Sequence, residues 1–261
     1  MTLLKHELRM GRKALAIWTA AIGGFIVCCI FLFPEMAGQM SSVSDMFASM
    51  GAFTAAFGMD RLNFGTLTGF YAIECGNILG IGGALFAAML SSNLLCKEEK
   101  ERTAEYLLTH PVRRSQVVAG KLLAMLVQTV VMNAVVFLMA VVSIVTIGYE
   151  VPWKELSLLH LSCFLVQVEL EGICFGISAF LHRGGLGIGM GIAIGMYFLN
   201  IVANLTEQAK FLKYITPFGY AEGADILSDG ALNLSYLAVG AVFTAIGILA
   251  AFWEYRRKDI H

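Results

Sequence analysis

The fold is decided by the uncharged stretch ALAIWTAAIGGFIVCCIFLF, which occupies residues 14–33. A helix needs about 20 apolar residues to cross the hydrocarbon core of a bilayer, and this stretch meets that requirement. A basic segment, Lys5–Lys13, precedes it, as in a secretory signal peptide. The apolar region of a signal peptide has only about 7–15 residues, however, so we expect a retained first membrane span.

Five further apolar stretches follow along the chain. They lack the two-residue alternation of barrel strands, so helices are the structure that satisfies their backbone hydrogen bonds in lipid. Hydrophobic residues make up 58% of the chain and charged residues only 14%, against about 25% charged in soluble domains. We therefore predict an all-α polytopic membrane protein in which residues 1–261 form one transmembrane domain. Its six spans lie near residues 14–33, 71–95, 119–147, 158–181, 186–205 and 232–252.

Lysine and arginine are distributed unevenly between the two sides that six spans define. One set of connections holds 14 of the 18 basic residues; the other holds only Arg61, Lys154, Lys210 and Lys213. Basic connections of membrane proteins stay in the cytoplasm. Both termini are therefore expected inside a bacterial or archaeal cell, as are the connections 96–118 and 182–185.

Two segments outside the spans suggest additional structure. Residues 1–13 combine Leu3, Leu4, Leu8 and Met10 with basic side chains, which fits either an amphipathic helix on the inner leaflet or a basic flank that fixes topology. On the outer side, the residues Pro217-Phe218-Gly219-Tyr220 would break any helix within 206–231. That segment could enter the outer interface as a short helical hairpin.

The composition and motifs argue against several function classes. A net charge of −1 gives no reason to expect a nucleic-acid partner. The six cysteines show neither metal-ligand spacing nor a C-x-x-C pair, so we predict neither a metal site nor a disulfide framework. No G-x-x-x-x-G-K-[ST] loop occurs, because Gly120-Lys121 is followed by Leu122 and preceded at the required spacing by Ser115. We do not expect this chain to bind ATP by itself.

The connection between spans two and three carries the most chemistry. Strong helix formers fill residues 97–108, and Glu98 and Arg102 form an i,i+4 pair in the favourable order. Pro111 disfavours helix at His110, so we expect the helix to end there. The segment is either a solvated charged loop that fixes topology or a rigid helix that a cytoplasmic partner contacts.

The stretch EEKERTAEYLLTHPVRRSQVVAGK, residues 98–121, resembles the cytoplasmic loop of ABC-2 type transporter permeases. In that pattern an acidic lead-in precedes Thr, a Leu-Leu pair, Pro with an aliphatic residue, and Gly-Lys entering the third span. Family members often have Gly before the Thr, where this chain has Arg102. The basic N-terminal segment, the six spans, the Pro-Phe-Gly region and the basic tail extend the resemblance over nearly the whole chain. The matching residues are Thr103, Leu107, Leu108, Pro111, Val112, Arg114, Ser115, Gly120 and Lys121.

The resemblance implies a permease subunit that is not an enzyme by itself. Its loop would carry a coupling helix that docks on a separate ATPase subunit, which would bind the ATP and Mg²⁺; no cofactor is expected in this chain. A second permease subunit, identical or homologous, would complete the path for export of a hydrophobic or amphipathic compound through the lipid bilayer. The expected ATPase contacts are Glu98, Glu101, Arg102, Glu105, Leu107 and Leu108.

Polar residues in span four allow other functions. His160, Gln167, Glu171 and Ser178 share one helical stripe, whereas Glu169 points elsewhere. A carboxylate at mid-bilayer costs about 2.5–3.5 kcal/mol on insertion scales, so at least one should face protein or water. Gln167, Glu169 and Glu171 could line a translocation path or form hydrogen bonds at a dimer seam. The alternatives to the permease are a proton-coupled secondary transporter or an intramembrane enzyme that uses these acids.

Overall fold

The computed structural model describes residues 2–37, 51, 54, 56–100, 113–182 and 184–258. Among these residues, six helices are long and apolar enough to cross a membrane, as predicted. The second span is composite, because α4 (Leu67–Phe70) and the π-helical η2 (Tyr71–Cys75) continue directly into α5 (Gly76–Ser92). The other five are α1 (Thr2–Ala37), α8 (Arg114–Thr146), α9 (Trp153–Phe180), α10 (Leu186–Leu205) and α12 (Leu234–Arg257).

The span boundaries differ from the predicted ones where local capping outweighs hydropathy. The second span starts at Leu67 rather than 71 because the Thr66 side chain accepts a hydrogen bond from the Gly69 amide at 3.2 Å. Helix α9 starts five residues before the predicted 158, directly after Pro152. Its first turn contains an acidic residue, which is favourable there although it is not apolar. Helix α12 likewise runs past 252 to end on two arginines, which suit a helix C-terminus.

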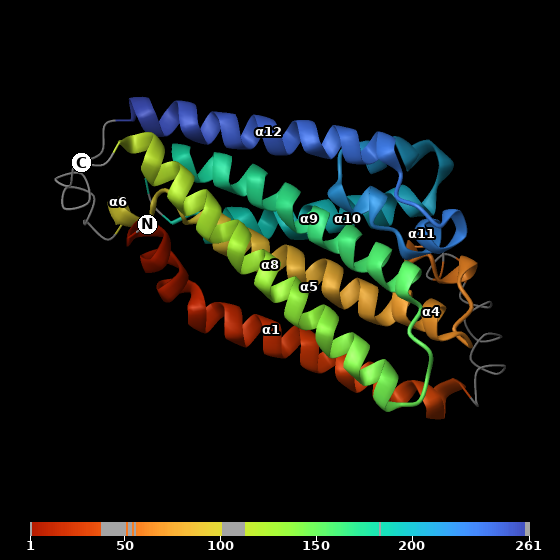
Figure 1. The fold of residues 1–261 in the computed structure, drawn as a ribbon. Coiled ribbons are helices and arrows are strands. Elements are labelled where there is room, and N and C mark those ends of the chain that lie inside the picture. Colours follow the sequence, from red (N-terminus) through yellow and green to blue (C-terminus); the bar gives the residue numbers. More distant parts are fainter. Residues whose placement is uncertain are drawn as a thin grey trace.

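The molecule has two ends that differ in character (Figure 1). The first turns of α1, the short helix α6 (Lys97–Lys100) and the last turns of α12 lie together at one end, which we call the terminal end. The distal end, on the opposite side, carries α4 and a run of short helices. These are η1 (Met59–Arg61), η3 (Glu207–Tyr214), η4 (Pro217–Tyr220) and α11 (Gly223–Asp229). The helical hairpin expected in 206–231 is thus replaced by three separate short helices.

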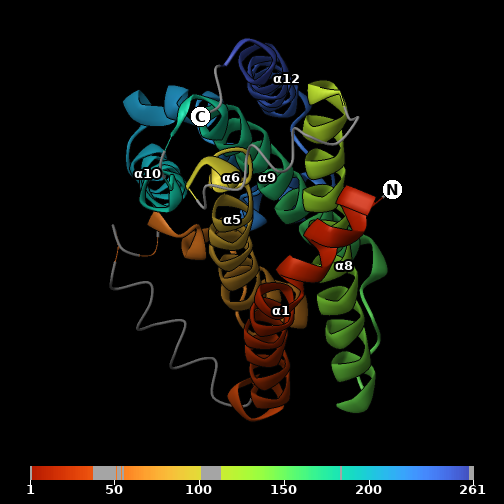
Figure 2. The same cartoon turned by 90° about the vertical axis from the view of Figure 1, so that its left-hand side faces the viewer.

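Helix α9 forms the centre of the bundle (Figure 2). It packs against α5, α8 and α12, and α1 covers α8 and α5 from the other side. In the most hydrophobic stretch of each helix, 67% of the residues of α9 are buried inside the bundle, compared with 11% of those of α12. Because the polar residues of span four would be costly in lipid, they belong on the most enclosed helix.

Glycine brings α9 and α12 into backbone contact. A Cβ at Gly176 would lie 2.6 Å from the carbonyl oxygen of Gly247, and one at Gly172 would lie 3.0 Å from the Cα of Thr244. No larger residue fits at Gly172 or Gly176, which is the close approach expected of glycines four residues apart. Helix α10 also has glycines four residues apart, at Gly187, Gly191 and Gly195. A Cβ added at any of these would have no described atom from outside α10 within 4 Å, so this glycine row contacts no other helix.

The N-terminal residues are helical, and they continue without a break into the first span. Figure 2 shows the first turns of α1 bending away from the rest of the helix and crossing α8. At the crossing, the side chain of Leu3 lies 3.2 Å from the position of a Cβ at Gly120. The glycine of the Gly-Lys pair therefore makes room for α1. Placement of this segment on the inner leaflet stays a prediction.

Candidate functional site

A buried lysine anchors α6 at the terminal end. Lys121 of α8 has no exposed surface. Its ammonium group donates to the Leu94 carbonyl at 2.5 Å and to the carboxylate of Glu98, and the Glu7 carboxylate lies 3.6 Å away. A charge removed from water needs such partners. The contacts join α1, α6 and α8 at one point.

Glu99, the next residue of α6, makes a second set of contacts. Its carboxylate lies 2.9 Å from the ammonium of Lys258 and 3.1 Å from Nδ1 of His182. Lys258 also donates to the Leu181 carbonyl at 2.6 Å, and its own carbonyl accepts from Arg114 at the same distance. These bonds tie α6 to the end of α12 and to the connection after α9. We call the set of Glu7, Glu98, Glu99, Lys121, His182 and Lys258 the α6 junction.

Of the predicted ATPase contacts, Glu98 alone lies within the described residues, and its carboxylate is engaged with Lys121 inside the chain. Its side chain is 14% exposed. The assignment of Glu98 to a partner surface stays a prediction. The remaining contacts, Glu101, Arg102, Glu105, Leu107 and Leu108, lie outside the described residues.

Two of the span-four residues form hydrogen bonds with α8 within the same subunit. Gln167 accepts from the Asn133 side chain at 2.6 Å, and Glu171 accepts from the Thr129 hydroxyl. Gln167 and Glu171 have no exposed surface in the single chain. Gly83 of α5 leaves the space that the Gln167 amide occupies. These two residues therefore hold α9 to α8 across the bundle interior.

Glu169 points to the other side of α9, as its place off the polar stripe predicted. Its carboxylate accepts a hydrogen bond from the Tyr220 hydroxyl at 2.9 Å and lies against Gly240 of α12. Burial and the nearby Glu169 charge raise the pKa of Tyr220 well above its ordinary value, so the phenol stays protonated and donates. A groove of about 330 Å³ opens beside this pair, with Leu165 and Thr244 among its lining residues.

His160, the outermost member of the stripe, is buried near the distal end of α9. Its Nε2 lies 2.7 Å from the hydroxyl of Tyr71, and Phe137 packs edge-on against its ring. Its Nδ1 has no partner among the described residues. The described parts of the chain contain no group of three His, Cys, Asp or Glu side chains that could hold a metal ion.

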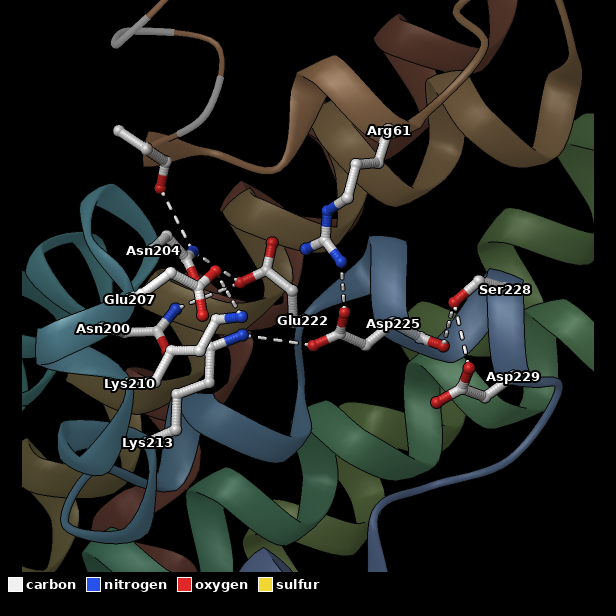
Figure 3. Close-up of polar contacts among 11 residues, drawn as sticks. Arg61, Asn200, Asn204, Glu207, Lys210, Lys213, Glu222, Asp225, Ser228 and Asp229 are labelled. Atoms are coloured by element: carbon white, nitrogen blue, oxygen red, sulfur yellow. Dashed lines mark hydrogen bonds and ion pairs between the residues drawn. The ribbon is translucent and has the colours of Figure 1, made fainter.

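The distal end holds a polar pocket of about 340 Å³ that no sequence motif predicted (Figure 3). Asp225 of α11 lies 2.5 Å from Arg61 and 3.2 Å from Lys213, and Lys210 lies 2.6 Å from Glu207. Burial alone would raise the pKa of Asp225, but the hydrogen bond from Arg61 and the charge of Lys213 hold it below the ordinary value. This distal pocket is lined by Arg61, Ala203, Asn204, Glu207, Lys210, Lys213, Asp225 and Tyr236.

A signal for this pocket was present in the sequence. Of the four basic residues predicted to face outward, three line the pocket, and only Lys154 does not. Arg61 is separated from Lys210 and Lys213 by about 150 positions along the chain, so no local motif joins it to them. The charge count alone could not show that the three converge.

Comparison with known proteins supports one family. A family model described as ABC-2 family transporter protein matches residues 1–260. A search of curated proteins found no match. The family match covers both the α6 junction and the distal pocket, since both lie within residues 1–260.

Proposed function

This chain belongs to the ABC-2 transporter family, and on that premise we propose that it is one half of an exporter driven by a separate ATPase subunit. Family membership makes it a multi-pass permease of an ABC transporter, in agreement with its six membrane-length helices. The proposal adds four points: the ATPase docks at residues 98–108, a second permease subunit completes the path, both termini are cytoplasmic, and the cargo is hydrophobic or amphipathic. The terminal end is then the cytoplasmic end.

The observation that carries the proposal is the α6 junction. Helix α6 directly precedes residues 101–108, where most of the predicted ATPase contacts lie. Glu98 binds Lys121 of α8, and Glu99 binds Lys258 at the end of α12. A displacement of the docking segment would therefore be transmitted to α1, α8 and α12 together. Such a connection is what transmission of ATP-driven closure requires.

Breaking a junction of this kind is costly, which makes it suitable for transmission. Removing one partner of a buried ion pair destabilises a protein by about 3–5 kcal/mol, because the other charge is left without compensation. Exposed ion pairs contribute only about 0–1 kcal/mol and would yield first. Lys121 is fully buried, and the side chain of Lys258 is 4% exposed. The pairs of Lys121 and Lys258 are therefore expected to move as a unit, whereas the contact of Glu99 with His182, whose side chain is 74% exposed, would yield first.

In this proposal the acids of span four are structural acceptors of hydrogen bonds. Glu171 is engaged by Thr129 and Glu169 by Tyr220. A proton-coupled transporter or an intramembrane enzyme would instead need one of these acids for each turnover. Substitutions in the docking segment should therefore remove the activity of a permease, whereas substitutions of the span-four acids should remove that of a proton-coupled transporter or an intramembrane enzyme.

The proposal is tested by co-expressing the chain with the ATPase encoded beside it and purifying through a tag on this chain. A Glu101→Ala/Leu107→Ala/Leu108→Ala variant should lose the ATPase or its stimulated hydrolysis. The matched control is the triple variant Glu150→Ala/Trp153→Ala/Lys154→Ala, which changes exposed residues near the distal end. It should keep the ATPase bound. If the loop variant behaves as wild type while Glu171→Gln abolishes transport, the coupling assignment is wrong and the proton-coupled alternative takes its place.

A further inference from the structure

A groove of about 330 Å³ lies along the contact between α9 and α12. The two helices run side by side through the bundle (Figure 1). The groove opens at the surface of the bundle, where Ala241 and Ala245 of α12 are exposed. Ligand pockets in proteins have volumes of about 300–1,000 Å³. The volume of this groove therefore suits a compact or single-chain compound rather than a lipid with two chains.

The groove is apolar except at one place. Among the described residues that line it, Glu169 alone is charged. The two lining hydroxyl groups are already engaged, because Tyr220 donates to the Glu169 carboxylate and Thr244 donates to the Gly240 carbonyl, both at 2.9 Å. Aliphatic side chains such as those of Leu237 and Ile248 form the walls. The groove thus combines an apolar slot with a single acidic group.

One oxygen of Glu169 remains available to a ligand. Its Oε2 accepts the hydrogen bond from Tyr220, whereas its Oε1 has no hydrogen-bond partner among the described residues. Gly240 leaves the carboxylate room, because a Cβ there would overlap it. The second oxygen of Glu171 also lacks a described partner, but it is sealed inside the bundle, whereas Glu169 lines the groove. A ligand can therefore reach Glu169 and not Glu171.

The charge of Glu169 has no counter-charge within the described parts of the chain. None of the ion pairs found there includes this residue. Tyr220 supplies a hydrogen bond but no positive charge. A carboxylate inside a membrane is costly without a partner, and apolar surroundings strengthen its attraction to a cation. The groove therefore favours a cation that carries an apolar body.

We propose that this groove binds a lipophilic ammonium ion with a single apolar chain. The ammonium group would donate to Oε1 of Glu169 in a charge-assisted hydrogen bond, and the chain would lie against Leu237 and Ile248. Tyr220 would keep the carboxylate in place. The inference goes beyond the proposed function, because the groove would bind such a compound with or without an ATPase. Glu171 faces α8, so it still separates the permease from a proton-coupled transporter.

The test measures binding of decylammonium and of its neutral counterpart decanol to the full chain in a neutral maltoside detergent, by isothermal titration calorimetry. We expect decylammonium to bind wild type about tenfold more tightly, since only it forms the charged hydrogen bond. Glu169→Gln keeps an acceptor for Tyr220 but removes the charge. It should weaken decylammonium about tenfold and leave decanol unchanged, so that the preference disappears.

Glu171→Gln is the matched control, because it neutralises an acid of the same helix that does not line the groove. It keeps an acceptor for Thr129 and should change either affinity by no more than about twofold. Ala241→Phe, at an exposed position of the groove, should weaken both compounds alike by filling it. The proposal is overturned if decylammonium shows no saturable binding or no preference over decanol. It is equally overturned if Glu171→Gln acts like Glu169→Gln, or if Ala241→Phe has no effect.

Discussion

Both ends of this bundle are built around ion pairs, but the two sets differ in their access to water. At the terminal end, Lys121 is fully buried and Lys258 has a 4% exposed side chain. At the distal end, the side chains of Arg61 and Lys210 are 47% and 58% exposed, whereas that of Lys213 is 9% exposed. A pair sealed from water has no other partner and fixes the elements that carry it. A pair open to water exchanges its partner readily and contributes little to the fold.

The largest change in stability is expected when Lys121 is substituted by methionine. The change removes the cation and leaves the Glu98 and Glu7 carboxylates buried without compensation. We expect a loss of about 3–5 kcal/mol in unfolding free energy, measured as a lower thermal midpoint in detergent. Adding Glu98→Gln should recover part of the loss. If Lys154→Met, at an exposed position, destabilises the chain as much, the α6 junction is not the stronger end.

A smaller effect is expected for Glu99→Gln. The substitution keeps the shape of the side chain but removes the charge that Lys258 and His182 contact. Lys258 keeps its bond to the Leu181 carbonyl, so we expect a loss of only about 1.5–3 kcal/mol. Thermal unfolding measures the effect, with Glu150→Gln as the exposed carboxylate control. A loss below that of the control would show that Glu99 contributes nothing to the junction.

Asp225→Asn tests the distal end through its pH dependence. The folded pKa of Asp225 is lowered from the ordinary 3.8, so its stabilising contribution is complete above that value and is lost as pH falls through the lowered pKa. Because the carboxylate is partly exposed, we expect the variant to lose no more than about 1 kcal/mol at neutral pH. Unfolding midpoints of the two proteins should then converge in acid. A constant difference at all pH values would rule out the carboxylate charge as its cause.

The smallest effect is expected for Lys210→Ala. Its pair with Glu207 is exposed, so removing it should change the unfolding free energy by about 0–0.5 kcal/mol. The measurement is the thermal midpoint in detergent. A loss above about 1 kcal/mol would show that this pair supports the fold, which would remove the contrast between the two ends.

Hydropathy was sufficient to predict the six spans, because each long helix among the described residues contains a long apolar stretch. Periodicity also predicted that Glu169 points away from Gln167 and Glu171, as their partners Tyr220, Asn133 and Thr129 confirm. Both results depend only on neighbours in the sequence. Helix ends were predicted less well, because side-chain caps and terminal charges set them.

The α6 junction and the distal pocket depend on contacts between distant residues and could not be predicted in the same way. Lys121 was assigned as a cytoplasmic charge and as part of the Gly-Lys pair of the family pattern, although it lay inside the predicted span 119–147. A lysine inside a span requires a partner, and that mismatch was the available signal. Its partners Glu7 and Glu98 could be identified only once the bundle placed α1 and α6 beside α8.

The backbone contact between α9 and α12 also bears on how well this protein insulates the membrane. Protons and small ions cross a bilayer protein along files of water or chains of polar groups, and a glycine seam that excludes even a Cβ has space for neither. Glu169 lies against Gly240 in the same α9–α12 contact and accepts from Tyr220, whereas Glu171 faces α8 and accepts from Thr129. A substitution that pushes α9 and α12 apart should therefore cause a proton leak across the membrane before it reduces transport activity.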